Sequence, residues 1–179
     1  VVGHLRDFAS APPRDAPVTV SFDFLCRPVA VEGTSRVEGL RGLWRVDPDR
    51  LADAARRSGE SEAVVVGVAR IGGCETVVAV MDFAFLGGSM GVEVGRRVSS
   101  AAELALERGL PLVTVCASGG ARMQEGVFSL FQMARVSEAF GRHREAGLFS
   151  VCVLTDPTYG GVSASFDTLA AVLVGGRGA

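Results

Sequence analysis

The sequence contains no lysine, because all eighteen of its basic residues are arginine. A P-loop nucleotide site and a Schiff-base enzyme both depend on a lysine side chain, so neither chemistry is open to this chain. A lysine general base is excluded for the same reason. Histidine is almost as scarce, since only two occur, and proton transfer by an imidazole therefore has few candidates.

Cysteine is present, but in a pattern that argues against metal binding. Cys26, Cys74, Cys116 and Cys152 are far apart in the sequence and form no C-x-x-C pair. Closely spaced Cys and His ligands are typical of zinc sites, so we expect no zinc or other metal site within this chain. Cys116 and Cys152 stand among Val and Leu, which favours reduced thiols packed in apolar strands. Such cysteine usage is typical of a cytoplasmic protein.

Long apolar runs and a strong net charge are also missing. The longest apolar stretches, residues 63–69 and 77–81, are far shorter than the roughly 20 residues of a membrane-spanning helix, so we expect no membrane span. The net charge is −2, and the arginines are scattered without aromatic residues between them, so we expect no binding of nucleic acid. With 179 residues, 48% of them hydrophobic, the chain is long enough for one globular core.

Strand-like and helical patterns alternate over most of the chain, and they predict a layered α/β fold with crossover helices. Residues 1–47 are interpreted as an irregular N-terminal lead-in and residues 48–179 as the folded domain. The pattern predicts strands at 63–71, 76–83, 110–116, 148–154 and 171–174, with Gly72-Gly73 as the first turn. It predicts helices from Asp47 or Asp49 to Arg57, at 89–108, at 122–143 and from the third glycine doublet to Phe166. The apolar positions expected on the third of these helices are Val127, Leu130, Phe131, Ala134 and Phe140.

Three glycine doublets stand at equivalent places in this alternation. Gly87-Gly88, Gly119-Gly120 and Gly160-Gly161 each follow an apolar run and each precede a helical pattern. A glycine pair lets a ligand approach the main chain closely, and the free N–H groups at the start of a helix favour negative charge. We therefore predict a site where backbone N–H groups face an oxyanion or an acyl-CoA, with simple turn geometry as the alternative.

A serine hydrolase is a second hypothesis, because Gly87-Gly88-Ser89-Met90-Gly91 fits the G-x-S-x-G motif with Ser89 as the nucleophile. That mechanism requires a histidine later in the chain. His143 is the only one, and its charged neighbours Arg142 and Arg144 indicate a solvent-exposed helix face. The sequence therefore favours the oxyanion site over the hydrolase.

Three further residues can have either a structural or a functional role. Glu125 and Asp156 lie in glycine-doublet segments, where a carboxylate can brace a turn as readily as move a proton, and we favour the bracing role. Trp44 is interpreted as a packing residue.

Four ordered stretches resemble one enzyme family, the β subunits of bacterial-type acetyl-CoA carboxylase carboxyltransferase. They read MDFAFLGGSMG (81–91), ASGGARMQE (117–125), SLFQMA (129–134) and VLTDPTYGGVSASF (153–166). The resemblance implies a crotonase-like ββα spiral, incomplete at the C-terminus. It also implies transfer of carboxylate from carboxybiotin to acetyl-CoA, giving malonyl-CoA. Biotin would arrive on a carrier protein, and an α subunit of the same fold would complete the active site.

The resemblance also implies roles for the doublets. In this family their N–H groups form oxyanion holes for the thioester enolate or the biotin ureido oxygen, and the α-carbon proton passes to biotin after CO₂ release. By motif match the catalytic residues are Gly119 and Gly120 first, then Gly160 and Gly161. The substrate-binding residues implied in the same way are Gly87, Gly88, Ser89, Met90, Ala121, Arg122 and Tyr159.

The chain departs from the family pattern in three respects. It carries no N-terminal four-cysteine zinc ribbon, and it ends soon after Phe166, where the family continues. Tyr159 stands where acetyl-CoA subunits commonly have Met, a change that can alter the acyl pocket. Two alternatives therefore stay open: an acyl-CoA carboxyltransferase or decarboxylase of different specificity, and a non-catalytic homologue that binds an α-type subunit. The acyl preference, the pathway and the coenzyme A-binding arginines are open as well.

Overall fold

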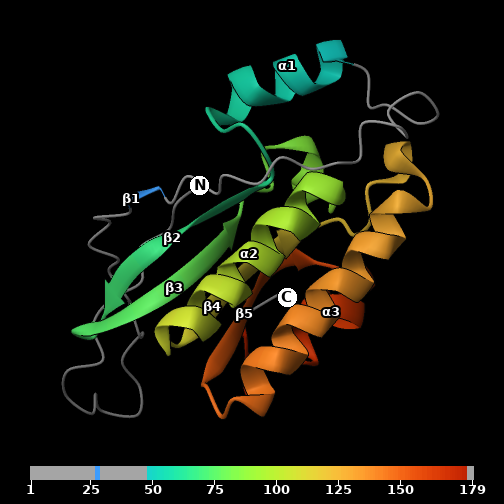
Figure 1. The fold of residues 1–179 in the computed structure, drawn as a ribbon. Helices are drawn as coiled ribbons and strands as arrows, with labels where there is room; N and C mark the ends of the chain where they lie inside the picture. Colours follow the sequence, from blue (N-terminus) through green and yellow to red (C-terminus); the bar gives the residue numbers. More distant parts are fainter. Residues whose placement is uncertain (1–26, 29–47, 177–179) are drawn as a thin grey trace.

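The structure, a computed structural model, describes residues 27–28 and 48–176, which fold around one six-stranded sheet (Figure 1). The strands lie in chain order across the sheet. They are β1 (Arg27–Pro28), β2 (Val64–Ile71), β3 (Cys74–Met81), β4 (Leu112–Ser118), β5 (Ser150–Thr158) and β6 (Val172–Gly175). β1, β2 and β3 pair antiparallel, whereas β3 to β6 pair parallel, so the sheet is mixed.

Helices make the crossovers between the parallel strands. α1 (Pro48–Ser58) precedes β2, α2 (Val92–Arg108) joins β3 to β4, and α3 (Phe128–Glu145) joins β4 to β5. Short turns, α4 (Gly160–Val162) and η4 (Ser163–Asp167), lead from β5 to β6, and η2 (Leu86–Gly88) and η3 (Met123–Glu125) lie in the two earlier connections. The alternation of strand, glycine turn and helix predicted from the sequence is therefore confirmed.

The main core lies between α2 and the sheet, and α2 and α3 run side by side over it (Figure 1). On α2, Val94, Val98, Ala101 and Ala105 are fully buried, and Leu104 is partly buried against the core. The predicted start of this helix at Ser89 is wrong. It begins at Val92, because Met90 pairs instead with Ala121 of the next loop in an isolated β-bridge.

The predicted apolar face of α3 points away from the core. Val127, Leu130 and Phe131 are 51%, 55% and 65% exposed. The buried positions of the helix are Ser129, Gln132, Val136, Ala139, Phe140 and His143, so of the predicted core residues only Phe140 is buried. The helix also begins six residues later than predicted, at Phe128, because Gly126 adopts a non-helical conformation. Periodicity located an apolar stripe but could not show which stripe faces α2.

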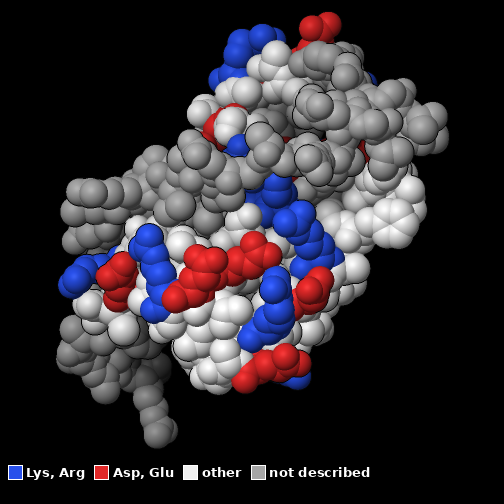
Figure 2. All heavy atoms as spheres, viewed as in Figure 1, with Lys and Arg blue, Asp and Glu red and all other residues white. Residues whose placement is uncertain are grey.

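Charged side chains of both signs alternate on the face that carries α2 and α3 (Figure 2). Glu93 of α2 pairs with Arg96 at 2.6 Å and with Arg97 at 2.9 Å, and Arg142 of α3 reaches Glu103 of α2 at 3.1 Å. Burial raises the pKa of the Glu93 carboxyl, but the hydrogen bonds from the two arginines outweigh burial and the pKa is lowered overall. None of the helices in the described residues is both long and apolar enough to cross a membrane.

Candidate active site

The loops that follow β3, β4 and β5 meet where these parallel strands end. Met90 N donates to Gly120 O at 2.8 Å, and Arg122 N donates to Met90 O at 2.9 Å. Gly119 N donates to Gly87 O at 2.9 Å. The first two glycine doublets are therefore held together by backbone hydrogen bonds. Ligands commonly bind at this edge of an α/β sheet.

Ser118, the last residue of β4, connects all three loops. Its buried Oγ donates to Gly88 O at 2.6 Å and accepts from Gly120 N at 3.0 Å. Its carbonyl oxygen accepts from Tyr159 N at 3.1 Å, which brings in the loop after β5. The motifs in the sequence assign Ser118 no role of its own. The available signal was a hydroxyl at the end of a strand, directly before a glycine doublet.

Two glycines are required by close contact between the loops. Gly88 has a φ of +63°, and a Cβ there would lie 1.9 Å from Ala117 O. A Cβ on Gly161 would lie 3.0 Å from Gly120 Cα and 3.2 Å from Ala121 N. Side chains at these positions would push the loops apart, so the three doublets are in direct contact because they are glycine.

The N–H groups of the first two doublets are largely used within the chain. Gly119 N donates to Gly87 O, Gly120 N donates to Ser118 Oγ, and Gly88 N donates to Phe85 O at 2.9 Å. The sequence pattern predicts that the N–H groups of Gly119 and Gly120 face a ligand. That expectation is corrected here, because both donate to acceptors in neighbouring loops.

Three other N–H groups are free. Among residues 27–28 and 48–176, no acceptor receives a hydrogen bond from the N–H of Ala121, Gly160 or Gly161. The bridge to Ala121 uses both backbone groups of Met90, which turns the Ala121 N–H away from Met90. Gly160 and Gly161 open α4, where the first N–H groups of a helix have no partner. The close approach of Gly161 to Ala121 N places these donors beside one another.

Arg122 is buried against these loops and is only 1% exposed. Its guanidinium forms an ion pair with Glu62, in which Nη1 donates to Oε2 at 3.0 Å and Nη2 donates to Oε1. Nη1 also donates to Glu125 Oε1 at 3.1 Å. Nε and Nη2 donate to the side chain and the carbonyl oxygen of Ser89 at 3.1 and 2.8 Å. The guanidinium carbon lies 5.8 Å from the centre of the Phe85 ring.

These contacts correct the substrate-binding role predicted for Arg122. All of its N–H donors are committed to the protein, so none is left for a ligand. Burial alone would lower the pKa of Arg122, but the carboxylates of Glu62 and Glu125 raise it overall and keep the side chain charged. Glu62, just before β2, was missed, and no sequence spacing links it to Arg122.

The carboxylate of Glu125 braces the site, as the sequence analysis favoured. Its Oε2 accepts from Val92 N, the first N–H of α2, at 2.6 Å. Asp156 is exposed near the end of β5. Met90, predicted to bind substrate, is fully buried beneath the doublets, whereas Tyr159 beside Gly160 is 61% exposed.

The serine hydrolase hypothesis is not supported, because the candidate general base His143 lies far from Ser89. Ser89 Oγ accepts a hydrogen bond from Arg122, at the carboxyl end of β3. His143, predicted to be exposed, is fully buried, and its Nε2 donates to Leu110 O at 3.1 Å. Leu110 lies before the first residue of β4, at the opposite end of that strand from Ser118. Imidazole and hydroxyl are therefore at opposite edges of the sheet.

Cys116 and Cys152 are buried on neighbouring strands, with their sulfur atoms 3.5 Å apart. The hydrogen bond to Cys152 and burial both raise the pKa of Cys116, which keeps it a thiol, as expected for packed reduced cysteines. Cys74 is exposed, and Cys26 and Trp44 lie outside the described residues. In the part of the chain that the structure describes, no three His, Cys, Asp or Glu side chains are placed to hold a metal ion. The expectation that this chain binds no zinc stays a prediction.

Comparison with known sequences gives a consistent set of relatives. The family model described as "Carboxyl transferase domain" matches residues 44–176. The chain is 58% identical over 132 residues to the acetyl-coenzyme A carboxylase carboxyl transferase subunits beta/alpha of Salinispora tropica, covering 74% of this chain and 23% of the relative. It is 53% identical over 132 residues to the subunit beta of Rubrobacter xylanophilus, covering 74% of this chain and 51% of the relative. The chain thus spans about half or less of the length of these relatives.

Solved structures of related enzymes are also similar to this chain. The transcarboxylase 12S structure with hydrolysed methylmalonyl-coenzyme A bound matches with a TM-score of 0.58 and 32% identity, over 63% of this chain and 22% of that one. The Pseudomonas malonate decarboxylase MdcD-MdcE hetero-dimer matches with a TM-score of 0.60 and 28% identity, over 66% of this chain and 54% of that one.

Proposed function

Because this chain belongs to the carboxyl transferase domain family, we propose that it acts as a β-type subunit that transfers carboxylate from carboxybiotin, held on a carrier protein, to acetyl-CoA. The product would be malonyl-CoA. The crotonase-like fold implied by the resemblance is confirmed by the solved structures that match. The domain boundary between residues 47 and 48 and the cytoplasmic location remain predictions.

The observation that carries the mechanism is the group of free N–H donors at Ala121, Gly160 and Gly161. Loss of a proton from the α-carbon of a thioester moves negative charge onto the thioester oxygen. Fixed donors aimed at that oxygen lower the barrier, and removal of one such donor costs about 10²–10³-fold in rate. Carboxybiotin, when bound, would supply the carboxyl group. The three N–H groups would hold an oxyanion, while Gly119 and Gly120 shape the turn that presents Ala121.

We propose that an α-type subunit covers the exposed apolar residues near these donors, here named the α3 surface. Met123, Val127, Leu130 and Phe131 form it, and they are 87%, 51%, 55% and 65% exposed. Exposed apolar residues grouped in this way, from η3 to the first turn of α3, are typical of a protein interface. A partner of the same fold is also in keeping with the fused beta/alpha relative and with the hetero-dimeric malonate decarboxylase.

A different acyl substrate is the second candidate, and Tyr159 is the residue that favours it. Its exposed side chain stands next to the donors at Gly160 and Gly161, where it would contact the acyl group of a bound thioester. A malonate decarboxylase component is among the similar structures. Substrate choice in this site would then be set by the ring at Tyr159, since the N–H donors do not distinguish acyl chains.

The test is formation of malonyl-CoA by the purified protein, alone and with a carboxyltransferase α subunit. Each assay contains biotin carboxylase, carboxylated carrier and acetyl-CoA, and parallel assays replace acetyl-CoA by propionyl-CoA. Product only in the mixture with the α subunit is the expected result. Transfer to propionyl-CoA alone would identify the second candidate. Absence of transfer to either thioester, with a folded protein by circular dichroism, would contradict the proposed function.

A further inference from the structure

The carboxyl end of β4 departs from the regular ladder with β5. Cys116 pairs with Leu154 and Ser118 pairs with Thr158, so one residue of β4 but three of β5 lie between these two pairs. Bulges of this kind bend a strand and are found often beside active sites. The loop after β5, which carries the third glycine doublet, therefore needs contacts besides the ladder to fix its position.

Two threonine hydroxyls and one backbone hydrogen bond hold β5 against β4 at this bulge. Thr155 Oγ1 and Thr158 Oγ1 donate to Cys116 O, at 2.8 and 3.0 Å. Ser118 O accepts from Tyr159 N at 3.1 Å, and Tyr159 directly precedes the third doublet. Ser and Thr hydroxyls commonly bond to backbone groups in this way where regular structure is interrupted. The chain is thus held against β4 up to the residue before the doublet.

The side chain of Ser118 holds the other two loops. Its Oγ donates its one hydrogen to Gly88 O at 2.6 Å and accepts from Gly120 N at 3.0 Å. Gly120 directly precedes Ala121, whose N–H is one of the three proposed oxyanion donors. Ser118 is therefore hydrogen-bonded to the immediate chain neighbours of two of these donors, Ala121 on one loop and Gly160 on the other.

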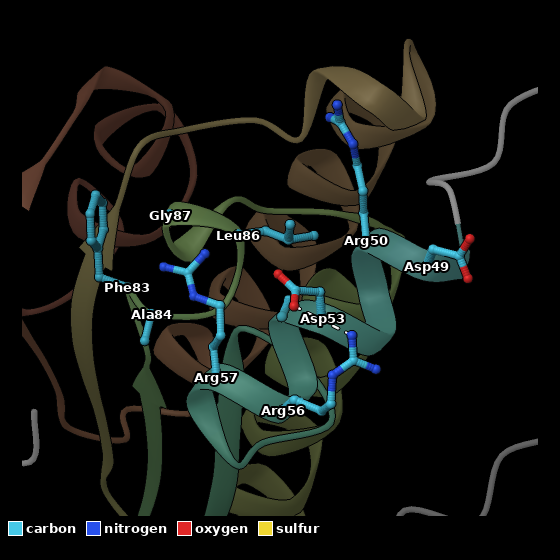
Figure 3. A pocket seen from close by; sticks show the side chains of 10 residues that line it. Asp49, Arg50, Asp53, Arg56, Arg57, Phe83, Ala84, Leu86 and Gly87 are labelled. Atoms are coloured by element: carbon cyan, nitrogen blue, oxygen red, sulfur yellow. Dashed lines mark hydrogen bonds and ion pairs between the residues drawn. The ribbon is translucent and has the colours of Figure 1, made fainter.

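The loop after β3 borders a pocket on its α1 side. This pocket has a volume of about 620 Å³, and Figure 3 shows Gly87 among the residues that line it. Toward β4, Gly87 O accepts from Gly119 N at 2.9 Å, and Gly88 O accepts from Ser118 Oγ. The first doublet is therefore held by hydrogen bonds from the β4 side, and Ser118 supplies one of them.

We propose that Ser118 is a positioning residue for the oxyanion site, and that it sets the distance between the N–H groups of Ala121 and Gly160. This inference rests on the proposed function, which gives those N–H groups their part in the reaction. Donors stabilise an oxyanion when they are fixed at hydrogen-bond distance from it, and a displacement of about 1 Å can lower the rate about 10²-fold. Ser118 is fully buried, so it acts through the donors and not on the substrate.

The experiment measures carboxyl transfer by the Ser118→Ala variant in the assembled carboxyltransferase. Gly120 N loses its acceptor, so kcat should fall about 10²-fold, while KM for acetyl-CoA stays unchanged. Ser150→Ala is the matched control. Ser150 is also buried and its Oγ accepts from Ala171 N at 3.0 Å, but it lies at the opposite end of β5 from the doublet. The control should lose a similar amount of thermal stability and keep its kcat.

A double-mutant cycle separates positioning from a general loss of stability. Gly160→Pro removes one of the two donors whose distance Ser118 is proposed to set. Ser118→Ala should therefore lower kcat less in the Gly160→Pro variant than in the unmodified protein. The same fold-loss of kcat in both would overturn the assignment.

Hydrogen exchange of single amides, followed by NMR, tests the positioning without the reaction. Tyr159 N–H keeps its acceptor, the backbone carbonyl of residue 118, in Ser118→Ala. Faster exchange of this amide than in Ser150→Ala would show that loss of the hydroxyl loosens the loop after β5, and this is the expected result. Equal exchange of Tyr159 N–H in the two variants would overturn the assignment, whether or not carboxyl transfer is detected.

Two further outcomes keep this inference separate from the proposed function. An unchanged kcat in Ser118→Ala would overturn the positioning role and leave the proposed function intact, whereas no transfer by the unmodified protein would contradict the proposed function. If circular dichroism shows that Ser118→Ala is unfolded, Ser118→Cys takes its place in each measurement. A thiol is a weaker donor and acceptor than a hydroxyl, so the same changes are expected with smaller size.

Discussion

The Gly119-Gly120 turn and the Gly160-Gly161 turn lie against each other, but they differ in whether their N–H groups have hydrogen-bond acceptors. Gly119 and Gly120 donate to Gly87 O and Ser118 Oγ, at 2.9 and 3.0 Å. Gly160 and Gly161 donate to no acceptor in residues 27–28 and 48–176. The first turn holds neighbouring loops in place, and the second presents donors. Of the two doublets, only Gly160-Gly161 therefore has N–H groups left to donate to a ligand.

The two turns also differ in what supports them. Beneath the first, the buried Arg122 joins Glu62, Ser89 and Glu125 into one network. The second has the exposed Tyr159 on one side and the buried Phe166 farther along the chain. The rigid turn can therefore fix the position of the Ala121 N–H, while the open turn leaves space for a substrate.

The largest expected effect comes from breaking the support of the first turn. Arg122→Met leaves the carboxylate of Glu62 buried without its partner, and we expect the free energy of unfolding to fall by about 3–5 kcal/mol. Urea denaturation measures it.

Two controls separate this effect from loss of any arginine. Arg142→Met removes an exposed ion pair with Glu103 and should cost about 0–1 kcal/mol. The double variant Glu62→Leu/Arg122→Met removes both buried charges and should recover a large part of the lost stability. If Arg122→Met cost no more than Arg142→Met, the network would not be what supports the turn.

A smaller effect is expected where the first two doublets touch. Gly88→Ala places a Cβ 1.9 Å from Ala117 O, and Gly72→Ala tests the same backbone region at a φ of +56° with no atom within 4 Å. Overpacking costs about 1–3 kcal/mol, so Gly88→Ala should be less stable than Gly72→Ala by about that amount. Thermal unfolding of the two variants gives the difference. Equal stability would mean that the loops are not in close contact.

The smallest effect is expected at Ser89. Its hydroxyl only accepts a hydrogen bond from Arg122 Nε, so Ser89→Ala should lower stability by about 1 kcal/mol and leave turnover close to normal. Steady-state kinetics in the mixture with the α subunit measure it. A nucleophilic serine would instead lose turnover altogether, which would reinstate the hydrolase hypothesis.

The order of strands and helices could be predicted from the sequence, because β-branched runs and glycine turns mark each unit locally. The meeting of the three doublets was also predictable, since parallel strands end at one edge. What each N–H donates to was not predictable. The acceptors are Gly87 O and Ser118 Oγ, and only the folded backbone shows that they lie within reach of Gly119 and Gly120.

The wrong predictions concern residues whose burial or contacts depend on which element packs against them. His143 stands among charged residues in the sequence, yet it is buried against Leu110 O because that stripe of α3 faces inward. Val127 and Phe131 follow a core-like period but are exposed, because their stripe faces away from α2 and the sheet. Glu62 lies sixty residues before Arg122, and local spacing does not encode a contact over that separation.

The most direct test of the account removes one free N–H and changes little else. Gly160 is the first residue of α4, its preceding residue is extended, and a Cβ there meets no atom within 4 Å, so both proline and alanine fit. Gly160→Pro deletes the N–H, whereas Gly160→Ala keeps it. In the complete carboxyltransferase, kcat should fall about 10²–10³-fold in the proline variant and stay near normal in the alanine variant. Equal kcat values in the two variants would contradict the claim that the open turn supplies the oxyanion donors.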